Sequence, residues 1–175
     1  MLLDGSSRGL LTWFWTTLRS PGQTMLEVVR YRILTETDSP SHFSKWMVAE
    51  IDGEVIGALC ATEIDKAGDP SDFPEVFAPL LELYALAVGT WHLWDVSVFP
   101  EHRGRGFGTA LLVEAENLAC RADARQISLV VETANVGALT LYRRYGFGEH
   151  ARRPYLPFPG STDEGDWLLL VKDLA

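Results

Sequence analysis

The spacing of apolar residues divides the chain into helical and extended segments. Apolar side chains recur at helical intervals over residues 10–19 and 24–34, and the Ser20-Pro21-Gly22 break between these segments predicts two helices. Two β-rich runs, residues 46–51 and 54–64, flank Asp52-Gly53, a dipeptide typical of a two-residue hairpin turn. The first part of the chain is therefore expected to hold two helices followed by a β-hairpin.

The second part of the chain alternates between strand and helix patterns. Residues 75–83 fit a short helix, residues 90–99 a strand, and a helix opened by a glycine-rich turn runs to about residue 122. An apolar strand at 127–132, a helix at 135–145 and strands at 148–155 and 167–173 follow. This order predicts an α/β fold, with one mixed, twisted sheet that carries helices on both faces.

Composition and charge narrow the class of protein. The 175 residues are 47% hydrophobic, which is enough for one domain, residues 1–175, with a single sizeable core. A net charge of -9 argues against nucleic acid and anionic membranes as general partners, because both attract basic surfaces. Cys60 and Cys120 form no metal-ligand spacing and no apolar run reaches transmembrane length, so we expect a soluble, cytoplasmic protein without a metal.

A glycine-rich turn between the strand at 90–99 and the next helix is the first candidate site. Its sequence is Arg103-Gly104-Arg105-Gly106-Phe107-Gly108-Thr109. Three glycines at alternate positions allow consecutive N–H groups to converge on an anion at the helix N-terminus, and two arginines add positive charge. The spacing is not the G-x-G-x-x-G of a dinucleotide fold, and the turn lacks the lysine of a nucleoside-triphosphate loop. A plain tight turn is the competing interpretation.

A second motif lies farther along the chain, on the helix at 135–145. It consists of Asn135-x-x-Ala138-x-x-Leu141-Tyr142-x-x-x-Gly146-Phe147. Together with Arg103-x-x-Gly106-x-Gly108, this motif resembles the signature of the GNAT superfamily of acyl-CoA-dependent N-acetyltransferases. The strongly matched residues run from about 91 to 147, and the order of the flanking elements agrees with a GNAT-like fold.

The resemblance implies how acetyl-CoA, the acetyl donor of that superfamily, would bind. Backbone N–H groups of residues 103–109 would hold its pyrophosphate, and the backbone of residues 96–98 would pair with its pantetheine arm like an extra strand. Asn135 would hydrogen-bond the cofactor near the pantetheine, and Tyr142 would lie beside the sulfur. The residues so assigned are Val96, Ser97, Val98, Arg103, Gly104, Arg105, Gly106, Phe107, Gly108, Thr109, Asn135 and Tyr142.

In relatives the residue matching Tyr142 is commonly given the role of general acid. Proton transfer from a phenol of pKa ~10 to a thiolate of pKa ~8.5 is uphill by roughly 2 kcal/mol. We therefore expect Tyr142 to stabilise the departing thiolate by a hydrogen bond. A tyrosine packed in the core is the competing interpretation.

The acceptor amine must also lose a proton, at a cost of about 4.6 kcal/mol for an alkyl amine of pKa ~10.4 at pH 7. Strand alternation groups His92 with Val96 and Val98 on one face and Asp95 with Ser97 on the other, unless a bulge changes the phase. Counted back from the glycine turn, His92 stands where some histone-modifying relatives carry a base glutamate. We expect His92 as the base, with Asp95 as the second candidate and a structural histidine as the competing interpretation.

The chain departs from the family pattern at its N-terminus. Relatives usually have a β-strand before the first helix, and here only Met1-Leu2-Leu3 stands in that place. Either the first strand is missing, or the start is mis-assigned, or another chain fills the edge. An uncovered strand beginning at Trp46 would be a template for a homodimer. Trp13 and Trp15 are candidates for the acceptor cleft, although core packing is expected for at least one of them.

These observations predict an N-acetyltransferase that moves acetyl from acetyl-CoA to a primary amine by direct attack, without a covalent enzyme intermediate. The acceptor stays open between small-molecule and peptide amines. Two alternatives also stay open: an acyl-CoA-binding sensor or scaffold with little turnover, and a transferase that uses a longer acyl group.

Overall fold

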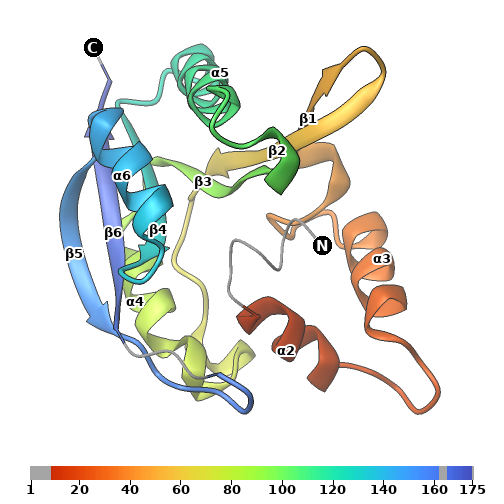
Figure 1. Cartoon of the computed structure of the whole chain (residues 1–175). Coiled ribbons are helices and arrows are strands. Elements are labelled where there is room, and N and C mark those ends of the chain that lie inside the picture. The colour runs from red at the N-terminus through yellow and green to blue at the C-terminus, as the bar shows by residue number, and fades with distance from the viewer. Residues whose placement is uncertain (1–8, 162–164, 175) are drawn as a thin grey trace.

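The computed structural model describes residues 9–161 and 165–174, and its elements follow the predicted order (Figure 1). One helix is displaced from the predicted 75–83: Glu75–Phe77 forms a 3-10 turn, and the α-helix begins afterwards. The reason is Pro79, which is tolerated only in the first turn of a helix. The helices and strands are α2 (Leu10–Thr17), α3 (Met25–Thr35), β1 (Trp46–Ile51), β2 (Glu54–Glu63), α4 (Ala78–Leu86), β3 (Trp91–Val98), α5 (Phe107–Arg121), β4 (Gln126–Glu132), α6 (Val136–Arg144), β5 (Gly148–Pro154) and β6 (Asp166–Asp173).

The strands form one six-stranded sheet in the order β1-β2-β3-β4-β6-β5. Neighbouring strands are antiparallel except β3 and β4, which are parallel and pair only over residues 91–93 and 127–129. Beyond these residues the two strands diverge (Figure 1). The sheet therefore opens into a wedge between residues 94–98 of β3 and residues 130–132 of β4.

The predicted hairpin is confirmed and supplies one edge of the sheet. Asp52 and Gly53 have φ of 51° and 84°, as a two-residue type I′ turn requires. β1 pairs with β2 on one side and is the last strand of the described sheet. Residues 1–8, which include the Met1-Leu2-Leu3 segment in the place of the family's first strand, lie outside the described residues.

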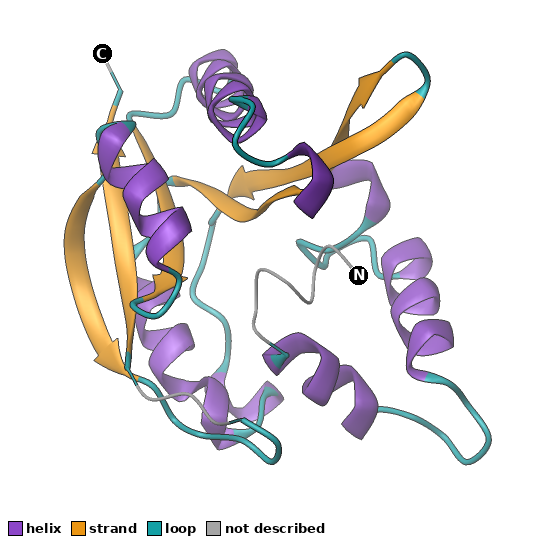
Figure 2. Ribbon diagram, in the orientation of Figure 1, coloured by secondary structure: helices purple, strands orange, loops and turns teal. Residues whose placement is uncertain are grey.

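Helices cover both faces of the sheet, as predicted (Figure 2). On one face Leu112 of α5 packs in the same core cluster as Leu170 of β6, and residues of α6 join it. On the other face Leu10 of α2 and Leu83 of α4 cluster with Leu169 of β6. Successive residues of β6 thus enter two different cores, which is typical of a strand buried on both faces.

Candidate functional site

The turn that follows β3 presents backbone rather than side chains to a cleft. Gly104 and Gly106 have φ of 73° and 87°, a left-handed conformation that residues with a Cβ disfavour. Gly106 is the N-cap of α5 and gives the helix no side-chain hydrogen bond, so the N–H groups of the first turn remain for a ligand. Arg103, Gly104 and residues 106–109 line the cleft. This geometry suits an anion at the positive end of α5.

The two arginines of this turn occupy different positions. Nε of Arg103 donates to the carbonyl of Val98 at 3.0 Å, which ties the turn to the end of β3. The guanidinium of Arg105 lies over the ring of Phe107, 5.2 Å from its centroid, and Arg105 is not among the described residues that line the cleft. Of the two predicted cationic side chains, only Arg103 therefore reaches the cleft.

The wedge between β3 and β4 continues the cleft away from the turn. Residues 94–98 of β3 border β2 on one side and pair with no described residue of β4 on the other. Val96, Ser97 and Val98 line the cleft together with residues 129–131 of β4. β3 thus offers a row of backbone groups along which an extended chain can bind as an added strand.

α6 begins at the wedge and follows it. Asn135 caps the helix, and its side-chain oxygen accepts a hydrogen bond from the N–H of Ala138 at 3.2 Å. Tyr142 lies seven residues later, two helical turns along, and both residues line the cleft. The helix therefore sets a polar cap and a phenol along one side of the wedge.

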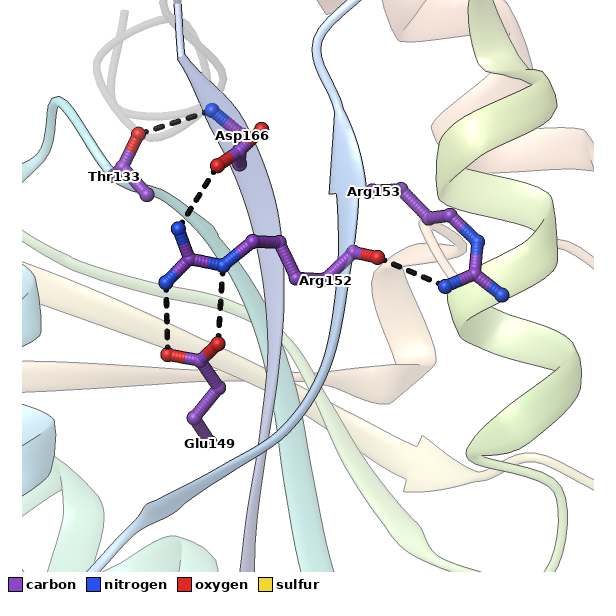
Figure 3. Close-up of polar contacts among 5 residues, drawn as sticks. All are labelled: Thr133, Glu149, Arg152, Arg153 and Asp166. Atoms are coloured by element: carbon purple, nitrogen blue, oxygen red, sulfur yellow. Dashed lines mark hydrogen bonds and ion pairs between the residues drawn. The ribbon is translucent and has the colours of Figure 1, made fainter.

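A polar network holds the segment that leads into α6 (Figure 3). Thr133 exchanges two hydrogen bonds with Asp166 of β6: its N–H donates to the carbonyl at 2.9 Å, and its hydroxyl accepts from the N–H at 3.0 Å. Arg152 of β5 then bridges the carboxylates of Asp166 and Glu149 at 2.9–3.1 Å. These contacts fix the start of α6 against two strands of the sheet.

α5 and α6 are also joined directly. A Cβ added to Gly108 would lie 3.0 Å from a methyl carbon of Leu141, so a larger residue would require the Leu141 side chain to shift. Glu116 of α5 accepts hydrogen bonds from Tyr145, at the end of α6, at 2.7 Å and from Lys172 of β6 at 2.6 Å. The Lys172 hydrogen bond is the main cause that lowers the pKa of Glu116. The glycine turn and Tyr142 therefore sit on helices in a fixed mutual position.

Tyr142 is buried at the cleft, with 8% of its surface exposed. Burial raises its pKa, and the negative charge of Asp95 raises it further. The phenol is therefore neutral near pH 7 and available as a hydrogen-bond donor. Because the raised pKa makes complete proton transfer to a thiolate more unfavourable, the structure favours a donated hydrogen bond.

Asp95 owes its position to a bulge in β3. β2 pairs Cys60 with Asp95 and Ala61 with Leu93, so Trp94 is an extra residue without its own partner in the register. Trp94 and Asp95 are consecutive, and both line the cleft. The bulge therefore places an aromatic residue and a carboxylate side by side at the cleft.

The simple alternation predicted for this strand is wrong beyond the bulge. Val96 and Val98 pack in the same core as Leu93, on the α5 face of the sheet. The hydroxyl of Ser97 donates to the carboxylate of Asp95, on the opposite side of the strand. The extra residue reverses the phase, because each later side chain is moved to the other face.

His92 lies beneath the cleft. It is 1% exposed, and it is absent from the described residues that line the cleft. Its Nδ1 is 2.8 Å from the hydroxyl oxygen of Ser128, which is 2.5 Å from that of Thr90. Burial lowers the pKa of His92 to about 3. Since a general base must reach the proton that it removes, this position argues against the predicted base and for the structural interpretation.

Neither cysteine is placed as a nucleophile. The thiol of Cys60 is buried and donates to the carbonyl of Pro40 at 3.0 Å. Burial, and secondly the charge of Asp95, raises its pKa to about 12, so the thiolate form is scarce at neutral pH. Cys120 is exposed on α5. Within the described residues, no group of three or more His, Cys, Asp and Glu could hold a metal ion.

The cleft, of about 1230 Å³, extends from the glycine turn to α2 and α4. We call its second part the aromatic half, after the side chains that line it: Phe14, Phe73, Phe77, Tyr84 and Trp94. The Phe14 ring centroid lies 5.0 Å from that of Phe77 and 6.1 Å from that of Phe73, and Tyr84 lies 5.2 Å from Trp94. The site thus combines a backbone-lined half with an aromatic half.

Sequence patterns revealed only part of the aromatic half. Of the two predicted tryptophans, Trp15 lines the cleft, whereas Trp13 packs on Phe158 with ring centroids 5.5 Å apart. Phe77 falls within the predicted helix 75–83, where its pattern indicates core packing, and Phe73 comes from a polar loop without periodic apolar spacing. The one available signal was an aromatic residue, Phe73, inside an otherwise polar loop.

Comparison with known proteins identifies the family. The model of the acetyltransferase (GNAT) family matches residues 8–147, which is most of the chain. The chain belongs to the acetyltransferase (GNAT) family. The predicted family and the predicted GNAT-like fold are thereby confirmed.

The individual relatives match the chain over part of its length or at low sequence identity. An N-alpha-acetyltransferase of Sulfurisphaera tokodaii is 32% identical over 109 residues, which cover 59% of this chain and 56% of that protein. The structure of Ard1 from Thermoplasma volcanium aligns with a TM-score of 0.56 at 16% identity, covering 99% of this chain and 91% of that one. A GNAT family acetyltransferase from Elizabethkingia anophelis, solved with acetyl-CoA bound, aligns with a TM-score of 0.53 at 16% identity, covering 89% and 95%.

These similarities support only limited conclusions about this chain. The chain spans between 24% and 56% of the length of the first curated relatives that it matches. The structural alignments, at 16% identity, bear on the fold alone. None of the described helices is both long and apolar enough to cross a membrane.

Proposed function

We propose that this protein transfers the acetyl group of acetyl-CoA to a primary amine by direct attack. The observation that carries the proposal is the wedge between β3 and β4, bordered at one end by the uncapped turn of α5 and along its side by Tyr142. One cleft therefore contains three features in succession. They are a helix N-terminus suited to phosphates, a free strand edge suited to an amide-containing arm, and a phenol suited to a leaving sulfur.

The donor half of the reaction uses the backbone. N–H groups of residues 103–109 would bind the pyrophosphate, and β3 at Val96, Ser97 and Val98 would pair with the pantetheine amides. Asn135 lies beside that path at the start of α6. A β3 N–H aimed at the thioester oxygen would stabilise the charge that develops there.

The transfer forms one bond and breaks another. The neutral amine nitrogen attacks the thioester carbonyl carbon, a C–N bond forms, and the C–S bond breaks with its electron pair on sulfur. Tyr142 donates a hydrogen bond to the departing thiolate. We assign the proton released by the nitrogen to Asp95, because its carboxylate lines the cleft whereas His92 does not.

No covalent enzyme intermediate is part of the proposal. Such a path needs an activated nucleophile, and the raised pKa of Cys60 together with its hydrogen bond to Pro40 makes that thiol inert. A ternary complex of enzyme, acetyl-CoA and amine is therefore expected, with the intersecting initial-rate patterns of a sequential mechanism.

Two measurements on the purified protein test the function. Calorimetric titration with acetyl-CoA should show binding, and release of free thiol from acetyl-CoA should rise when a panel of primary amines is added. Binding without any amine-dependent thiol release would reject turnover and leave an acyl-CoA-binding sensor. Competition with longer acyl-CoA species, such as butyryl-CoA and octanoyl-CoA, determines which acyl group is transferred.

A homodimer through β1 is a further part of the proposal. The outer edge of β1 is unpaired in the described sheet, and Val48 is 61% exposed. Antiparallel pairing with a second copy about an axis between Val48 and Ala49 would set Lys45 opposite the second copy's Asp52. Val48→Lys should convert a dimer to a monomer in sedimentation velocity. Val113→Lys changes an exposed valine of α5 and should leave the dimer intact. Identical sedimentation of the two variants would reject this interface.

A further inference from the structure

The aromatic half of the cleft is an open surface rather than a closed core. Phe73 is 37% exposed, although its ring lies 5.7 Å from that of buried Phe77 and 6.1 Å from that of Phe14. These three rings come from α2, from the loop after β2 and from the turn before α4. An aromatic wall built from three separate segments and left accessible on one side is an apolar binding surface.

A second aromatic group lies next to the proposed proton acceptor. Trp94 immediately precedes Asp95, and the bulge turns both toward the cleft. The indole N–H of Trp94 is held by the Thr62 hydroxyl at 2.8 Å, and Tyr84 packs 5.2 Å from the indole ring. The indole is therefore fixed in place beside a carboxylate.

Carboxylates and cations both line the cleft. The carboxylates are Asp38, Glu63, Asp65 and Asp95, and Lys66 is among the cations. Arg32 also lines the cleft but is paired with Glu36 at 2.9 Å. Lys45 donates to two backbone carbonyls at 3.0 and 3.3 Å. Aromatic faces attract ammonium ions as well, so the rings and the carboxylates act in the same direction.

We propose that the acceptor is a primary amine on a short carbon chain that ends in an aromatic ring. This inference rests on the proposed acetyl transfer. The ring of the acceptor would pack on Phe73 and Trp94, and its nitrogen would lie at Asp95. The reaction itself is the one proposed above: a C–N bond forms, the C–S bond breaks, and a proton passes to Asp95.

Other amine classes use this surface less well. A diamine or polyamine would bring a second ammonium to the aromatic wall, where the loss of its hydration opposes the cation–π attraction and little apolar area is buried. A peptide N-terminus would bring backbone amides to a wall that consists mainly of rings, and buried amides without partners are costly. Both classes are included as acceptors in the experiment that follows.

The experiment measures kcat/KM for four acceptors with saturating acetyl-CoA: phenethylamine, cyclohexylethylamine, putrescine and trialanine. We expect phenethylamine to exceed putrescine and trialanine by at least tenfold, and cyclohexylethylamine by a few fold, because edge and face contacts between rings add to area burial. Faster turnover of putrescine or trialanine would overturn the aromatic acceptor and leave acetyl transfer intact. Absence of turnover with every amine would overturn acetyl transfer itself.

Two matched variants test whether Phe73 contributes to binding of the aromatic acceptor. Phe73→Leu keeps an apolar side chain but removes the ring, so KM for phenethylamine should rise about tenfold, with kcat and the acetyl-CoA KM nearly unchanged. Phe43→Leu makes the same change at an aromatic residue that is 55% exposed and outside the described cleft lining, and it should leave all three values unchanged. Equal effects of the two variants, or no effect of Phe73→Leu, would overturn the assignment of this surface.

Discussion

Tyr142 of α6 has a pKa that is raised by burial and, secondly, by the negative charge of Asp95 of β3. Both side chains line the same cleft. Burial and this charge both favour the neutral phenol, so the proposed acceptor of the amine proton helps to keep the proposed donor to the leaving sulfur protonated. The pair divides the two halves of the reaction between one acidic and one neutral group.

Tyr142→Phe removes the donor while keeping the ring. We expect kcat to fall roughly 100-fold, because one hydrogen bond to developing charge is lost, and the Kd for acetyl-CoA to change less than threefold. Steady-state kinetics and calorimetry on the same preparation give both values. A parallel loss in kcat and acetyl-CoA affinity would instead indicate that the tyrosine serves packing.

Asp95→Asn tests the proton acceptor. The substitution is nearly isosteric and should lower kcat/KM for the amine by roughly 100-fold or more, since general base assistance is lost. Asp72→Asn removes the same charge from an exposed position outside the described cleft lining, and it should keep wild-type kinetics. If both variants behave alike, long-range charge and not proton transfer accounts for the effect.

Gly106→Asp tests the anion site. A carboxylate in the turn should abolish measurable acetyl-CoA binding in calorimetry, through charge repulsion at the helix N-terminus. Gly22→Asp is a close control, because Gly22 has φ of 82° against 87° at Gly106 and its Cβ position is equally open. Both variants carry similar backbone strain. Unchanged acetyl-CoA affinity in Gly106→Asp would refute the pyrophosphate assignment.

The stability of the folded protein should depend on pH because of His92. Its pKa is 6.5 in the unfolded chain and about 3 in the folded protein, so below pH 6.5 only the unfolded chain takes up the proton. The free energy of unfolding should therefore fall by about 2 kcal/mol from pH 7 to pH 5 on account of this residue. Urea unfolding of the wild type and of His92→Gln at both pH values measures it. The variant should lose this part of the slope, and parallel behaviour would show that His92 titrates normally in the fold.

The sequence predicted most elements because their signals are local. The Asp52-Gly53 turn, the glycines before α5 and the cap at Asn135 each depend on backbone preferences within a few residues. The bulge at Trp94 depends on pairing with a strand more than 30 residues earlier in the chain, which no local pattern records. The prediction of His92 as the base rested on its position relative to the glycine turn and on the pKa of an imidazole, and neither records that Asp95 lines the cleft whereas His92 does not.

The aromatic half was hidden for a similar reason. Phe73 stands in a polar loop, and only tertiary packing brings it to Phe14 of α2. The burial of His92 likewise depends on Tyr84 and Ser128, which come from a helix and a strand on either side of it in sequence. Residues proposed to bind an acceptor by packing are harder to predict than residues proposed to bind a donor by backbone geometry.

The close contact of Gly108 with Leu141, together with the link from Glu116 to Tyr145 and Lys172, has a consequence for evolution and engineering. A change in α5 on the proposed donor side would therefore require adjustment in α6 and β6. The aromatic wall belongs to none of these elements. New acceptor preferences can therefore be introduced by exchanging residues of α2 and of the loop before α4 without readjusting the machinery that handles the thioester.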